Sequence, residues 1–167
     1  MKNNIILFGF MGCGKSTVGA LLAQMTNRPL LDTDAYLEHK YGRAIPDIFA
    51  SDGEAAFREM ERAVCAEMAG QTGLILCCGG GTVLDGENAK ILAQTGEMVF
   101  LKADFDVCYE RIRQSNRPLV RQNTKEALLE IFRQREPVYQ SRASLVADAA
   151  LPPRQAALSV LGALNRK

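Results

Sequence analysis

A glycine-rich loop near the start of the chain carries its clearest chemical signal. Residues 9–17 read GFMGCGKST and lie between an apolar run and a helical pattern. Glycines let backbone N–H groups turn toward phosphate oxygens, a lysine adds positive charge at the outer phosphates, and a serine hydroxyl can ligate Mg²⁺. The loop therefore predicts a nucleotide site with Mg²⁺, formed by Gly12, Cys13, Gly14, Lys15, Ser16 and Thr17.

Two acidic residues follow the next apolar segment. Asp32 and Asp34 are one residue apart, so in an extended chain both side chains point the same way. Beside a phosphate loop, one suits the water shell of Mg²⁺ and the other a hydroxyl nucleophile. The alternative is that one of them caps the following helix, since aspartate is favoured at that position. Capping and catalysis can also be divided between the two.

Three consecutive glycines, Gly79, Gly80 and Gly81, end an apolar run at residues 74–78. Glycines cost conformational entropy on folding, so a triplet after a buried strand favours close approach of a ligand to the main chain. A simple turn is the alternative.

Arginines are concentrated in and after a polar segment at residues 113–123. Phosphoryl transfer requires cations around the transferring group, and Arg117 lies in this segment. Arg135 precedes a proline at an expected helix end, where the helix dipole alone favours a cation. Arg58 lies on a helix, where an isolated arginine is usually solvated surface. The single histidine, His39, is expected on an exposed helix without a catalytic role.

Strands and helices alternate along the chain, which predicts an α/β fold with a parallel sheet covered by helices on both faces. Ligands bind at the carboxyl ends of such strands, where two segments outside the framework begin: a helical insertion at residues 33–61 and the polar loop at 113–123. The expected strands are 5–8, 29–32, 74–78, 98–101 and 144–147, and the expected helices are 15–25, a broken helical stretch from 33 to 70, 105–112, 124–136 and 155–164.

Length and composition indicate one domain spanning residues 1–167, with 47% apolar residues. Twenty basic and nineteen acidic side chains nearly balance, which disfavours nucleic acid or a membrane surface as a partner and favours a small molecule. The first strand begins at residue 5, so no signal peptide is expected, and no apolar run approaches a membrane span. Five cysteines without metal-ligand spacing predict reduced thiols and a cytoplasmic protein.

Several motifs in this order and spacing make the chain resemble the shikimate kinases. They are GFMGCGKST, Asp32-Thr33-Asp34, the segment from Ile45 to Glu61 containing Phe57-Arg58-Glu59-Met60-Glu61, the glycine triplet, Arg117-Pro118-Leu119 and Arg135-Glu136-Pro137-Val138-Tyr139. The resemblance implies a three-layer αβα P-loop fold of the nucleoside-monophosphate-kinase type, with a core, a helical substrate-binding arm and a lid. It also implies a monomeric, ATP-dependent kinase that makes shikimate 3-phosphate in chorismate and aromatic amino acid biosynthesis.

The same resemblance implies roles for individual residues. Lys15, Asp34 and Arg117 would be catalytic, and ATP would lie on residues 12–17 with Arg117. Mg²⁺ would be held by Ser16, with Asp32 acting through water. Adenine contacts fall less clearly on Arg111 and Arg154. The residues that would hold shikimate are Asp34, Arg58, Gly79, Gly80, Gly81 and Arg135.

Other interpretations remain open on the sequence alone. A gluconate kinase or a nucleoside-monophosphate kinase would share the loop and the element order, but the glycine triplet with Arg58 and Arg135 argues against both. A nucleotide-binding regulatory module would retain the loop without transfer chemistry. It would have no need of a clamp for a carboxylate.

Overall fold

The computed structural model describes residues 3–167, so Met1 and Lys2, which entered the prediction about a signal peptide, lie outside the described part. A five-stranded sheet forms the centre of the molecule, in the order β2-β3-β1-β4-β5 with every neighbouring pair parallel. This confirms the predicted parallel α/β architecture. The strands are β1 (Asn4–Phe8), β2 (Leu30–Asp32), β3 (Ile75–Cys77), β4 (Gly96–Lys102) and β5 (Leu145–Asp148).

The register of the sheet brings three sequence motifs to one edge. Leu7 of β1 and Asp32 of β2 both pair with Cys77 of β3, so these strands end at the same level. The phosphate loop, the acidic pair and the glycine triplet each follow one of these three ends. All residues of β1 and β3 are buried, as expected for interior strands of a parallel sheet.

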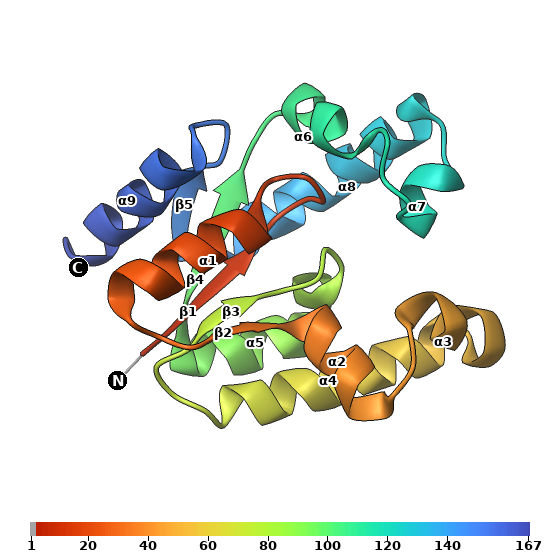
Figure 1. Cartoon of the computed structure of the whole chain (residues 1–167), viewed down its shortest axis with the longest axis horizontal. Helices are drawn as coiled ribbons and strands as arrows, with labels where there is room; N and C mark the ends of the chain where they lie inside the picture. Colours follow the sequence, from red (N-terminus) through yellow and green to blue (C-terminus); the bar gives the residue numbers. More distant parts are fainter. Residues whose placement is uncertain (1–2) are drawn as a thin grey trace.

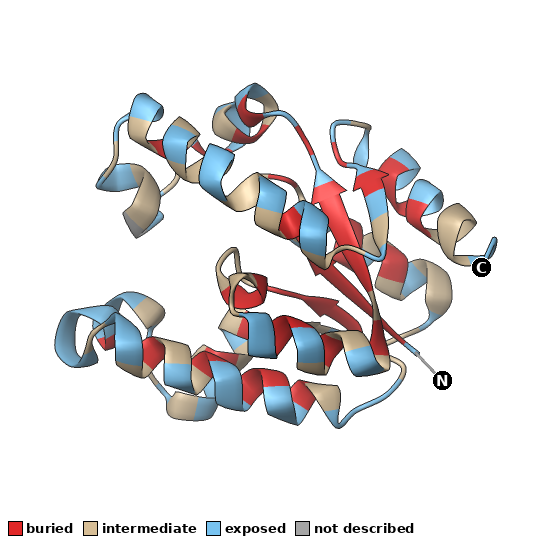
Figure 2. Ribbon diagram, turned by 180° about the vertical axis from the view of Figure 1, so that it is seen from behind, coloured by how far each residue is buried: buried red, intermediate tan, exposed pale blue. Residues whose placement is uncertain are grey.

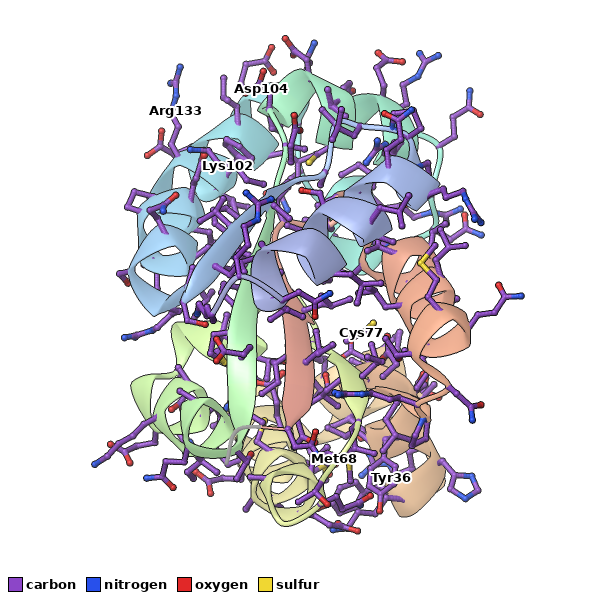
Figure 3. The ribbon with its side chains drawn as sticks, turned by 90° about the vertical axis from the view of Figure 1, so that its left-hand side faces the viewer. Tyr36, Met68, Cys77, Lys102, Asp104 and Arg133 are labelled. Carbon is purple, nitrogen blue, oxygen red and sulfur yellow. The ribbon has the colours of Figure 1, made fainter. Side chains whose placement is uncertain are left out.

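Helices cover both faces of the sheet and make the three layers visible in Figure 1. α1 (Lys15–Thr26) packs beside α9 (Pro153–Leu164) on one face, while α5 (Gly86–Thr95) and α8 (Lys125–Arg142) pack on the other. Buried residues follow the strands and the inward sides of these helices (Figure 2). Figure 3 shows Cys77 on the α1 side of the sheet, where its thiol donates to the carbonyl oxygen of Lys15 at 3.3 Å.

The segment predicted to be an arm, residues 33–61, is helical, and its last helix continues beyond it: α2 (Thr33–Tyr41), α3 (Ile45–Asp52) and α4 (Glu54–Ala69). The breaks predicted in this helical stretch fall at Gly42 and Gly53, whose φ angles are 63° and 88°, in the region that favours glycine. Tyr36 of α2 donates to Glu67 of α4, and Lys40 pairs with the same carboxylate at 2.7 Å. The helix that carries Asp34 is thereby fastened to the helix that carries Arg58.

The expected lid region contains more helix than the sequence predicted. α6 (Phe105–Ile112) has the predicted bounds, and a short α7 (Pro118–Arg121) lies within the segment expected to be loop. The prediction that the next helix ends at Glu136 was wrong, because α8 continues through Pro137 to Arg142. α5 and the 3₁₀ turn η1 (Thr82–Leu84) were also not predicted.

All five cysteines are free and buried. Burial raises the pKa of Cys65, Cys77 and Cys108 to about 12, so these thiols stay protonated at neutral pH. No helix among residues 3–167 is long and apolar enough to cross a membrane.

Candidate active site

The loop after β1 has the backbone geometry that phosphate binding requires. Gly12 and Gly14 have φ angles of 83° and 95°, in the region that favours glycine. α1 begins at Lys15 with glycine at its N-cap position, so its first N–H groups have no side-chain partner from the cap. Lys15 Nζ donates to the carbonyl oxygens of Gly9 at 2.8 Å and Phe10 at 3.4 Å. The loop thus presents N–H donors and one ammonium group at a helix N-terminus, which is an anion site.

The two acids after β2 have different environments. Asp32 Oδ1 accepts hydrogen bonds from the backbone N–H groups of Asp34 at 2.9 Å and Ala35 at 3.0 Å, so Asp32 caps α2. The capping alternative is therefore confirmed for Asp32. Burial above all, and then the charges of Asp32 and Glu61, raise the pKa of Asp34 from 3.8 to about 6, although Lys15 lowers it. A carboxylate with a pKa near neutral is suited to accept a proton.

Each glycine of the triplet makes room for one predicted site side chain. A Cβ on Gly79 would lie 2.6 Å from Asp34 Oδ1, and one on Gly81 would lie 2.6 Å from Arg58 Nη1. On Gly80 it would lie 3.4 Å from Arg135 Nη1. A methyl group at the first or third position would displace the side chain facing it. The triplet is therefore more than a turn, because it is the surface against which the acid and the two arginines are set.

Arg58 is held from two sides and is not a solvated surface residue. Its Nη1 pairs with Glu61 Oε1 at 3.0 Å, and its guanidinium carbon lies 5.1 Å from the centre of the Phe57 ring. Glu61 is buried, and its second oxygen accepts a hydrogen bond from Thr82 Oγ1 at 2.9 Å. Glu61 was not predicted as a site residue, although its position three residues after Arg58 on one helix is a detectable signal for such a pair.

These residues line one cleft of about 1160 Å³ between the phosphate loop, the arm and the lid segment. Arg117, which precedes α7, lines it from the lid side, and Phe49 and Pro46 of α3 line it from the arm side. Arg135 does not lie at a helix end, so the helix dipole does not explain its position. The predicted site residues that line the cleft are Gly12, Gly14, Lys15, Ser16, Thr17, Asp32, Asp34, Arg58, Gly79, Gly80, Gly81, Arg111, Arg117 and Arg135.

Residues 11–165, almost the whole chain, match the family model described as shikimate kinase. The chain belongs to the shikimate kinase family. A shikimate kinase of Pseudomonas savastanoi pv. phaseolicola is 41% identical over 164 residues, which cover 96% of this chain and 95% of that protein. A shikimate kinase of Coxiella burnetii is 40% identical over 163 residues, covering 95% and 91%.

Solved structures agree with this assignment to the shikimate kinase family. The shikimate kinase from Acinetobacter baumannii, solved in complex with shikimate, has a TM-score of 0.93 and 34% identity, covering 99% of this chain and 94% of that one. A gluconokinase from Sinorhizobium meliloti has a TM-score of 0.63 and 19% identity, covering 98% and 92%. The second comparison shows the shared fold alone.

Two residues predicted to contact ATP do not reach the cleft with their side chains. Cys13 is buried, and Arg154 is exposed at the start of α9. A second cavity of about 300 Å³ shares Arg111 with the cleft, and Cys13 lines it. Arg111 donates to the carbonyl oxygens of Gly12 at 3.1 Å and Ala149 at 3.2 Å. Pro153, next to Arg154, lines this cavity. Sequence reasoning missed Pro153, which has no polar group to attract notice.

The residues beside the phosphate loop fit Mg²⁺ as a partner of bound phosphates. Ser16 and Asp32 both line the cleft with oxygen donors, which Mg²⁺ prefers. The hydrogen bonds that Asp32 accepts for capping both reach Oδ1, so none of them uses its other oxygen. Among the described residues, no group of three or more His, Cys, Asp or Glu could hold a metal by itself. This donor set suits an ion that keeps several waters and shares its coordination with phosphates.

Proposed function

We propose that this chain transfers the γ-phosphoryl group of ATP to the 3-hydroxyl of shikimate, giving shikimate 3-phosphate and ADP. The observation that carries the proposal is the glycine triplet, with Asp34, Arg58 and Arg135 each set against one glycine beside a phosphate loop. A planar carboxylate matches the fork of a guanidinium group, and two arginines in one cleft can hold it from two directions. Family membership and the shikimate-bound relative from Acinetobacter support shikimate as the acceptor.

The transfer requires little covalent chemistry from the protein. The oxygen of the 3-hydroxyl forms a bond to the γ-phosphorus, the bond from that phosphorus to the bridging oxygen of ADP breaks, and the hydroxyl proton passes to Asp34. Lys15 and Arg117 stabilise negative charge on the transferring group. Ser16 and Asp32 would hold Mg²⁺, Asp32 through water, and the ion would supply further neutralisation of phosphate charge.

We also infer that Arg111 and Pro153 hold the base of the nucleotide in the smaller cavity, next to the loop that binds its phosphates. Residues 33–61 would serve as the substrate-binding arm and residues 113–123 as a lid within a single kinase domain of residues 1–167. Free cysteines and a near-neutral charge support a cytoplasmic protein without a nucleic acid or membrane partner. A monomer is proposed because the large exposed apolar side chains come from four separate elements.

The first test is release of ADP from ATP and Mg²⁺ with shikimate, gluconate, AMP or no acceptor. We expect release only with shikimate, and loss of release when a chelator removes Mg²⁺. Release with gluconate or AMP instead would move the assignment to one of the other small-molecule kinases. Tight ATP binding without release for any acceptor would favour a nucleotide-binding regulatory module.

Replacing Glu61 with Gln should weaken shikimate binding. The change removes the charge that pairs with Arg58, and a hydrogen bond to a charged group contributes about 1.5–3 kcal/mol. We therefore expect KM for shikimate to rise about tenfold or more, with KM for ATP nearly unchanged. Because the Glu61 charge also raises the pKa of Asp34, the acid limb of the pH profile should move to lower pH.

Glu59→Gln provides the matched control, since Glu59 lies on the same helix but pairs with the exposed Arg62. It should change neither KM nor the pH profile. Equal effects of the two substitutions on KM for shikimate would show that Glu61 does not position Arg58.

A further inference from the structure

Tyr139 ties α8 to the middle of the glycine triplet. Its side chain is 1% exposed, and its hydroxyl donates to the carbonyl oxygen of Gly80 at 2.6 Å. The ring packs against Phe8 and Phe100, with centroids 6.0 and 5.5 Å apart. With the ring fixed by two buried strands, the direction of the hydroxyl group is fixed as well. The bond therefore sets the orientation of one particular peptide group.

That peptide group joins Gly80 to Gly81. In a trans peptide the C=O and N–H groups point in opposite directions, and residues 3–167 contain no cis peptide bond. Because Tyr139 holds the Gly80 oxygen, the N–H of Gly81 points away from Tyr139. Among the backbone hydrogen bonds of the described residues outside regular helices and strands, none uses this N–H. Gly80 and Gly81 both line the cleft, and a Cβ on Gly81 would meet Arg58.

Arg135 converges on the same place from one helical turn earlier. A Cβ on Gly80 would lie 3.4 Å from Arg135 Nη1 and 3.9 Å from the Tyr139 hydroxyl oxygen. Residues four apart on a helix face the same side, which accounts for the shared approach. Burial, the largest effect, raises the pKa of Tyr139 to about 12, although Arg135 acts to lower it. The phenol is therefore a neutral hydrogen-bond donor across the physiological range.

We propose that Tyr139 is a positioning residue for the acceptor's carboxylate: by holding the Gly80 carbonyl, it directs the Gly81 N–H and the Arg135 guanidinium into the cleft as one set of donors. The proposal rests on the proposed function. Tyr139 does not touch the substrate, because it is buried behind the triplet. Tyr139 acts through the backbone of the glycine triplet and through the side chain of Arg135, one helical turn earlier.

A second hydrogen bond joins α8 to the segment that follows the triplet, and it provides a contrast with the bond of Tyr139. Arg142 Nε donates to the carbonyl oxygen of Val83 at 3.2 Å, beyond the triplet and one turn further along α8. Val83 lies within η1 and does not line the cleft. The two bonds join the same elements, but only the bond of Tyr139 orients a group that faces the cleft.

The test is the Tyr139→Phe enzyme, which loses one oxygen atom and keeps the ring. One unpaired buried carbonyl costs about 1–3 kcal/mol, less than the stability of an ordinary domain, so the variant should fold. We expect KM for shikimate to rise about tenfold, which corresponds to one misdirected hydrogen bond. KM for ATP should change by less than about twofold, and saturating shikimate should restore most of the turnover.

Two controls separate positioning from stability. Arg142→Ala should lower Tm without changing KM for shikimate, and Tyr109→Phe should change neither, since no hydrogen bond of the Tyr109 hydroxyl is found in the described structure. A Tyr139→Phe enzyme with a lowered Tm and an unchanged KM for shikimate would overturn the proposal and leave Tyr139 a purely structural residue. Absence of shikimate-dependent ADP release in the unsubstituted enzyme would instead overturn the proposed function, and this proposal with it.

Discussion

Replacing Asp34 with Asn is expected to lower turnover by about 10²–10⁴-fold, the usual contribution of a positioned proton acceptor. The amide keeps the size of the side chain, so it still fits against Gly79, but it can no longer accept the hydroxyl proton. ATP affinity should change little, because the phosphate loop is intact. The measurement is kcat with saturating shikimate, together with the Kd for ATP.

The same substitution should make the protein more stable at neutral pH. The raised pKa of Asp34 means that ionisation opposes folding, fully above a pH of about 6 and not at all below the ordinary value of 3.8. A shift of this size corresponds to a cost of about 3 kcal/mol. Asn carries no charge, so Asp34→Asn should gain about 1–3 kcal/mol in unfolding free energy at pH 8. The gain should shrink as the pH falls from about 6 toward 4, where Asp34 becomes neutral in both states.

Activity and stability thus change in opposite directions at one residue, which separates this effect from general damage. The wild-type enzyme should also lose kcat/KM as the pH falls through about 6, when Asp34 takes up a proton. Asp106→Asn on the exposed first turn of α6 is the matched control. It should leave turnover unchanged and should not raise the unfolding free energy, because an acid in the first turn of a helix is mildly stabilising. Full turnover in the Asp34→Asn enzyme, or a loss of stability at pH 8, would remove Asp34 from its proposed role.

Much of the site could be predicted from the sequence because its residue types act locally. Gly12 and Gly14 are required by left-handed backbone angles, and Lys15 and Ser16 follow them directly on a helix start. The parallel sheet also follows from alternating elements, and it brings the loop, the acids and the triplet to one edge without further information. Local pattern and topology together account for this part of the cleft.

The remaining contacts depend on pairs that are distant in the chain. Nothing near Glu61 indicates that Thr82 donates to it, and nothing near Tyr139 indicates Gly80, fifty-nine residues away. Pro137 removes one helical hydrogen bond, so the sequence favours a helix end there, yet α8 continues to Arg142. Packing of Tyr139 against Phe8 and Phe100 supplies a tertiary reason for the helix to continue. The helix propensities of the residues around Pro137 do not reveal this packing.

Substitution of Arg117 tests the proposed role of the lid in catalysis without lowering the stability of the protein. Its backbone N–H donates to Ser115 Oγ, and its carbonyl oxygen accepts from the N–H groups of Val120 and Arg121. The contribution of Arg117 to the start of α7 therefore comes from its backbone and not from its side chain. No partner of its guanidinium group is found among the described residues, although the side chain lines the cleft. Truncation to alanine therefore removes a cation from the cleft and leaves the fold of the lid intact.

Arg117→Ala should lower kcat by about 10³-fold, the lower end for an arginine that stabilises a transferring phosphoryl group. Unfolding free energy should change by less than about 0.5 kcal/mol, as for a surface substitution. The kcat of the Arg117→Lys enzyme should lie between those of the wild-type and Arg117→Ala enzymes, because a lysine keeps the charge but loses the planar fork. Arg121→Ala is the control, since Arg121 bonds Asn116 within the same segment and does not line the cleft. A change in kcat below about threefold for Arg117→Ala would mean that another cation neutralises the transferring group.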